Sequence, residues 1–149
     1  MFNLKFLIGI LSYFLIIQVS VADTPTISGQ VIPSQSFIQK QVGGGKAVIE
    51  IFKEGKNAFI GRLTLAPHGK VPKHRDPTEE YLLIESGRGH ITIDGKKTLV
   101  KAGDFIYMPA LAEVSFKNGD QPLIALQIFA GPQSARKYDQ WQTVKSQKN

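Results

Sequence analysis

The chain has 149 residues, with 18 Lys and Arg against 12 Asp and Glu, which gives a net charge of +6. This length corresponds to one ordinary domain and excludes a multidomain enzyme. A hydrophobic fraction of 42% with 14 Gly and 8 Pro is typical of a globular, turn-rich chain, so disorder along the whole length is excluded. The absence of Cys excludes a disulfide framework, a thiolate zinc site and an iron–sulfur cluster. The lysines are scattered rather than clustered with aromatic residues, so no nucleic-acid partner is expected.

Residues 1–22 have the features of a secretory signal peptide: an early Lys, an apolar stretch over 6–17 and a small-x-small site at Ser20-Val21-Ala22. The alternative is an uncleaved membrane anchor, but the apolar stretch is shorter than the ~20 residues that span a bilayer. We therefore expect cleavage after Ala22, a secreted or periplasmic protein, and no membrane association after signal cleavage.

The rest of the chain is interpreted as an arm, a β domain and a short helix. Residues 23–35, rich in Thr, Pro and Ser, are expected to form a loose N-terminal arm. Over residues 36–131 apolar side chains alternate at period two between turn signals, which predicts about eight to ten short strands in an all-β sandwich or barrel. Residues 132–149 predict a short C-terminal helix, capped by Ser134, and a polar tail.

Two local signals refine this β domain. Asp94-Gly95 predicts a hairpin between 90–93 and 97–100, because a type I′ turn needs a positive φ at both central residues. The strand expected at 122–129 is apolar on both faces, which indicates that a partner or another edge covers its second face. This strand is consistent with a homodimer.

Polar chemistry concentrates in residues 65–87. In an extended strand His74 and Asp76 project to the same side, because side chains alternate between faces. If the chain bends at Pro77, then Glu79 or Glu80 at the start of the next strand can return to meet them. One imidazole and one or two carboxylates are thus expected to converge.

This segment resembles the first motif of the cupin superfamily, a His-x-His pair followed by a Glu and a Gly. Three residues separate Asp76 from Glu80, and six separate Glu80 from Gly87, as in the family. The second family motif is matched in register by Gly103, Pro109 and Asn118. The resemblance implies a single jelly-roll, double-stranded β-barrel over most of the chain, and it also implies a homodimer.

The sequence departs from the family motifs at three positions. Asp76 stands where the second His is expected, Leu111 where a Gly is expected, and Val114 where the third His is expected. Members that use a metal typically bind it with three His and one Glu, so the resemblance leaves His74, Asp76 and Glu80 as the candidate metal ligands. Such an oxygen-rich set suits Mn²⁺, Fe²⁺ or Mg²⁺ better than tetrahedral zinc. The alternative is a hydrogen-bonded polar cluster in which His74 pairs with a carboxylate.

The remaining candidate residues are assigned by their strand positions. His68 is expected in a surface turn and His90 facing outward. Gln127, on an apolar strand face, is expected to be an inward amide with a partner. The candidate lining of the ligand pocket is Tyr81, Tyr107, Val114, Phe116 and Gln127.

Two functions remain open. One is an exported binding protein that holds a small organic ligand in the barrel, with or without a divalent metal at His74, Asp76 and Glu80. The other is a metal-dependent oxygenase or isomerase acting on a small polar molecule, in which Glu80 or Asp76 moves protons as a catalytic residue.

Overall fold

The computed structural model describes residues 28–144, so the expected signal peptide at 1–22 lies outside the described residues. Residues 1–30 and 31–149 form two separate units, and of the first only 28–30 are described. No helix among the described residues is long and apolar enough to cross a membrane.

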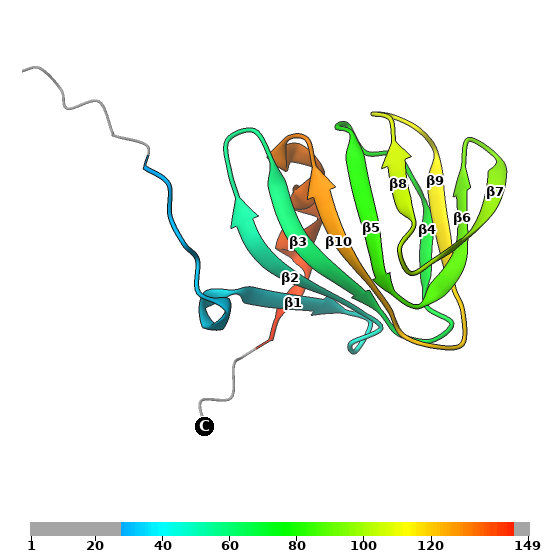
Figure 1. The fold of residues 1–149 in the computed structure, drawn as a ribbon, viewed down its shortest axis with the longest axis horizontal. Helices are drawn as coiled ribbons and strands as arrows, with labels where there is room; N and C mark the ends of the chain where they lie inside the picture. The colour runs from blue at the N-terminus through cyan, green and yellow to red at the C-terminus, as the bar shows by residue number, and fades with distance from the viewer. Residues whose placement is uncertain (1–27, 145–149) are drawn as a thin grey trace, which may run out of the picture. The chain divides into compact units, whose positions relative to one another are not determined.

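Two antiparallel sheets make up the domain (Figure 1). The seven strands of the first sheet, in chain order, are β1 (Ile38–Val42), β2 (Ala47–Glu54), β3 (Phe59–Leu65), β5 (Glu80–Ser86), β8 (Phe105–Met108), β10 (Leu123–Phe129) and β11 (Gln142–Thr143). The four strands of the second sheet are β4 (Lys70–His74), β6 (Arg88–Ile93), β7 (Lys96–Lys101) and β9 (Val114–Asn118). Two 3₁₀ helices flank them, η1 (Ser34–Ser36) and η2 (Pro132–Gln140).

The strands are paired in the orders β11-β1-β2-β3-β10-β5-β8 and β4-β9-β6-β7. Strands next to each other in a sheet are therefore often distant in sequence, as in β10, which lies between β3 and β5. This arrangement confirms the all-β jelly-roll prediction, although the described strands form two separate ladders rather than one closed barrel.

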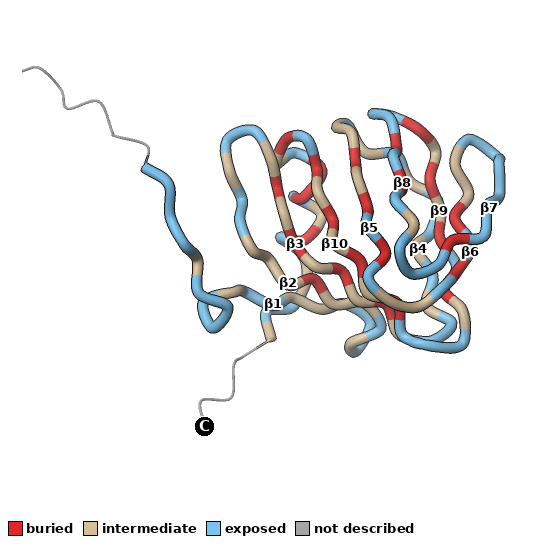
Figure 2. Tube along the Cα trace, viewed as in Figure 1, coloured by how far each residue is buried: buried red, intermediate tan, exposed pale blue. Residues whose placement is uncertain are grey.

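Alternating burial along the strands places the core between the sheets. Both β3 and β10 alternate strictly between buried and half-buried residues, the pattern expected for strands with one face inward (Figure 2). The most completely buried large side chains are Ile49, Phe59, Ile84 and Phe129.

The predicted hairpin joins β6 to β7. Asp94 and Gly95 have φ angles of 47° and 83°, both positive, as a type I′ turn requires. Leu111, which stands where the family motif has a glycine, also has a positive φ of 65°. This is a conformation that glycine adopts more easily than leucine does.

The C-terminal segment differs from the expected helix and polar tail. Helix η2 is a 3₁₀ helix that begins at Pro132, and Ser134 is not its cap but a buried residue whose Oγ lies 2.6 Å from Thr78 Oγ1. Beyond it, β11 pairs with β1 and adds a strand to the first sheet. These residues therefore belong to the folded domain.

Candidate functional site

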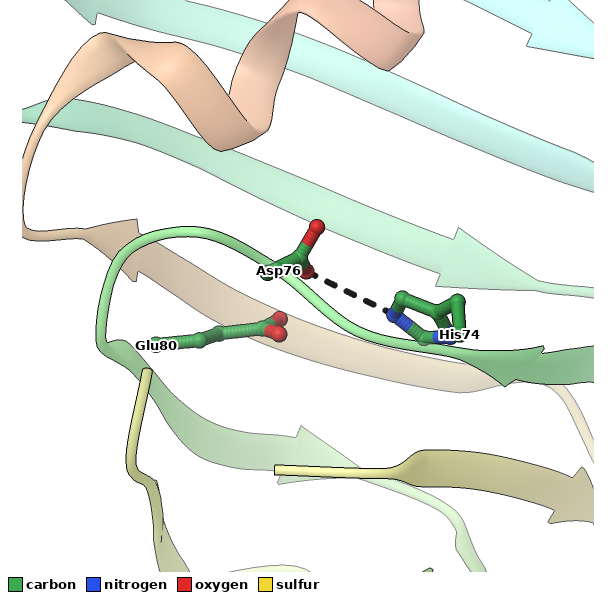
Figure 3. Close-up of side chains that lie close together, drawn as sticks. All are labelled: His74, Asp76 and Glu80. Atoms are coloured by element: carbon green, nitrogen blue, oxygen red, sulfur yellow. Dashed lines mark ion pairs between the residues drawn. The ribbon is translucent and has the colours of Figure 1, made fainter. Parts of the chain in front are cut away.

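His74 and Asp76 meet where β4 ends. His74 is the last residue of β4, and Asp76 lies in the loop that follows, with 3.5 Å between His74 Nε2 and Asp76 Oδ2 (Figure 3). The other ring nitrogen, Nδ1, lies 2.9 Å from the backbone carbonyl oxygen of Pro72. The imidazole is thus fixed between a carbonyl group and a carboxylate.

Glu80 is the inward-facing acid of the next strand. As the first residue of β5 it is 6% exposed, and its carboxylate accepts a hydrogen bond of 2.5 Å from Gln127 Nε2. Gln127 Oε1 in turn accepts a hydrogen bond of 2.5 Å from the hydroxyl of Tyr138. Of the two acids considered from the sequence, Glu80 turns into the protein, and Glu79 instead accepts hydrogen bonds from Tyr81 and Tyr107.

The three side chains have different electrostatic environments. Pairing with the Asp76 carboxylate raises the pKa of His74, against the opposing effect of burial. Burial by itself raises the pKa of Asp76, but His74 and Lys137 stabilise its charged form and the net pKa is lowered. Burial raises the pKa of Glu80 despite the hydrogen bond from Gln127. The site therefore combines one carboxyl group whose pKa is lowered, Asp76, with one whose pKa is raised, Glu80.

Lys137 joins this cluster from η2 and was missed by the sequence analysis. Its Nζ lies 2.7 Å from Asp76 Oδ2, the same oxygen that faces His74, and 4.8 Å from the centroid of the Phe129 ring. The only signal in the sequence was the pair of aromatic residues Tyr138 and Trp141, three apart in an otherwise polar segment. Tyr138 is 3% exposed and anchors η2 against the core.

A cavity of about 470 Å³ lies between the two sheets and beside η2. Its wall includes the three residues of the cluster together with the predicted Val114, Phe116 and Gln127. Most of the rest is apolar, and it includes Leu63, Leu82, Ile91, Met108, Ala125 and Trp141. The cavity is therefore hydrophobic, with charged groups near one part of its wall.

The structure corrects the placement of Tyr81 and Tyr107, which do not line this cavity. Tyr81 follows the inward Glu80 on β5 and so faces the opposite side of the sheet. Tyr107 is paired with Tyr81 across β5 and β8, is 48% exposed, and has its ring centroid 5.4 Å from that of Tyr81. The two rings form part of the outer surface.

The other residues singled out from the sequence lie away from the cluster. His68 is exposed, with a positive φ of 58°, and His90 is exposed on β6, as expected for both. Asn118 has a structural role: it is 2% exposed, and its amide donates to the carbonyl groups of Leu65, Ala66 and Gln121.

Three side chains of the cluster carry atoms that can bind a metal ion. One ligand atom each from His74, Asp76 and Glu80 lies within 4.8 Å of the others, so the residues are grouped closely enough to approach one ion. However, Val114 is paired with His74 across β4 and β9 and has no donor atom. In addition, the Lys137 ammonium already contacts Asp76 Oδ2. As arranged here, the residues do not fit a resident metal.

The comparisons with known proteins agree with the fold. Residues 61–129 match the family described as "Cupin domain". No functionally curated protein matches the chain.

Among solved structures, an RmlC-like cupin from Shewanella frigidimarina has a TM-score of 0.63 and 13% identity, with 70% of this chain and 92% of that one covered. A predicted oxalate decarboxylase from Thermotoga maritima has a TM-score of 0.57 and 21% identity, with coverage of 68% and 99%. The polyketide cyclase RemF from Streptomyces resistomycificus has a TM-score of 0.60 and 15% identity, with coverage of 68% and 79%. Sequence identities this low show a shared fold and nothing about a shared activity.

Proposed function

Residues 61–129 match the cupin domain family and the fold is shared with cupin structures, so we propose that the chain is a cupin that binds a small organic molecule in the cavity between its two sheets. The observation that carries the proposal is the cavity itself, about 470 Å³ with a largely apolar wall and a few convergent polar groups. This volume lies within the range of pockets that hold small ligands, roughly 300–1,000 Å³.

The wall indicates a ligand with an apolar body and one polar end. Val114 and Phe116 from β9 face Leu82 and Ala125 from the other sheet across the cavity, and these side chains offer only dispersion contacts and burial. The ammonium of Lys137 has N–H donors beyond the one directed at Asp76, and these can be donated to a polar group of the ligand at the same wall.

A metal-dependent oxygenase or isomerase is the second candidate. It is favoured by the proximity of His74, Asp76 and Glu80, whose ligand atoms lie within 4.8 Å of one another. Glu80, buried and with a raised pKa, is also suited to hold and release a proton. It is the weaker candidate because the donor set as arranged does not fit a resident metal.

Trp141 provides the assay for ligand binding. It is the only tryptophan of the chain and lines the cavity, so its fluorescence reports on occupancy directly. We would titrate a panel of small amphipathic acids, amides and alcohols into the protein and confirm each hit by thermal stabilisation.

A matched pair of variants locates the binding site. Val114→Phe fills the cavity and is expected to abolish binding, whereas Ser115→Phe, on the opposite face of β9, leaves it unchanged. A second pair compares His74→Ala, expected to weaken binding, with His90→Ala, which alters an exposed residue outside this cavity. Equal loss in both members of a pair, or hits that bind Val114→Phe normally, would refute the proposal.

Export and dimerisation complete the proposed function. We propose a secreted or periplasmic protein that loses residues 1–22, as the sequence pattern indicates.

We also propose a homodimer through the outer face of the first sheet, where Leu83, Phe105 and Tyr107 are exposed beside the half-buried Leu126 and Ile128. The mass of the exported protein tests the cleavage, and light scattering that finds only monomer at micromolar concentration would refute the dimer.

A further inference from the structure

Lys137 is held in place by the helix that carries it. Three residues before it, Ser134 is buried and contacts Thr78, and the next residue, Tyr138, is buried against Phe59 and Phe129. The lysine backbone is thus fixed between two anchors. Its side chain, 33% exposed, reaches Asp76 from this fixed position.

The ammonium supplies the positive charge that the acidic group of the cluster requires. Asp76 has a side-chain exposure of only 14%, and the Lys137 ammonium and the His74 imidazole both lie beside its carboxylate. A divalent cation at the same carboxylate would either displace the ammonium or lie close to it, and the repulsion between like charges is strong in a partly buried site.

The neighbourhood also lacks the donor that would compensate for this repulsion. Val114 is the cross-strand partner of His74, so the position beside the imidazole is apolar. Glu80 is engaged with Gln127. The cluster therefore has one cation already present and an incomplete donor set for another.

We infer that the ammonium of Lys137 takes the place of a divalent metal at His74, Asp76 and Glu80, so that the cavity works without a metal ion. The inference rests on the proposed function only in assigning the cluster to the ligand cavity. It assigns to Lys137 a positioning role toward Asp76 and the exclusion of metal from the cluster.

Metal titration tests the inference without any ligand. Wild-type protein freed of metal by chelation is expected to show no Mn²⁺ binding at the cluster by calorimetry. Lys137→Met is expected to gain Mn²⁺ binding, with an affinity at least about tenfold above the upper limit that calorimetry sets for the wild type, because a like charge at the carboxylate is gone. Lys97→Met, which removes an exposed lysine of β7, is the matched control and is expected to behave like the wild type. Adding His74→Ala to Lys137→Met is expected to remove the gained binding.

The outcomes are distinct from those of the ligand assay. Lys137→Gln keeps an N–H donor for Asp76 and serves as the second charge-free variant if Lys137→Met does not fold, which thermal unfolding shows. Binding of Mn²⁺ by the wild type that depends on His74 overturns the inference. The inference is also overturned if Lys137→Met and Lys137→Gln bind Mn²⁺ no more tightly than the wild type, or do not bind it at all. In that case the Lys137 ammonium is not the group that excludes the metal. Failure to find an organic ligand leaves these results intact and counts against the proposed function alone.

Discussion

The hydroxyl of Tyr138 is expected to contribute far more to stability than its size indicates. Tyr138→Phe keeps the ring, which packs 5.6 Å from Phe59 between centroids, and removes only the group that donates to Gln127 Oε1. Because Gln127 is 3% exposed, its oxygen then loses its buried donor. Leaving such an acceptor unsatisfied costs about 1–3 kcal/mol.

Tyr81→Phe is the matched control for this prediction. The hydroxyl of Tyr81 also donates to a side-chain oxygen, that of Glu79 at 2.7 Å, but this pair lies on the outer surface, where water replaces the lost partner. We expect a cost below about 0.5 kcal/mol for this variant. Urea unfolding followed by circular dichroism measures both free energies. If the two variants lose the same free energy of unfolding, burial is not the reason that the Tyr138 hydrogen bond stabilises the protein, and the prediction is refuted.

Two further predictions concern His74 and Leu111. The pKa of His74 is raised by Asp76, so its contribution to the free energy of unfolding is full below about pH 6.5 and is lost as the pH rises through the folded-state pKa. His74→Gln should therefore flatten the decline of stability above that pH, and a decline kept in full by His74→Gln but removed by His90→Gln would contradict this. Leu111→Gly should raise the free energy of unfolding by about 0.5–1 kcal/mol, because Leu111 is 62% exposed and has a φ of 65°. A lower unfolding midpoint in urea would contradict it.

The sequence predicts those features of the fold that depend on local rules. Alternation at period two gives the inward residues of β3, β9 and β10, and Asp94-Gly95 gives the hairpin because its turn depends on two adjacent backbone conformations. The convergence of His74 and Asp76 also follows from their spacing along an extended chain.

The errors have physical reasons as well. Glu80 and Tyr81 were both placed inside, although neighbours on one strand face opposite sides, so only one of them could line the cavity. Lys137 was missed because its contact with Asp76 joins residues far apart in sequence, and the segment that forms η2 is mostly polar. Neither the local sequence around Lys137 nor that around Asp76 predicts this contact.

The short segment η2 has a consequence for how chemistry diverges among such proteins. Lys137, Tyr138 and Trp141 all reach the cavity from beyond residue 129, where the family match ends. A change of a few amino acids in this terminal stretch can therefore alter what the interior accepts while the two sheets stay the same. The wall of the cavity is thus shared between the matched segment and a terminal stretch outside it.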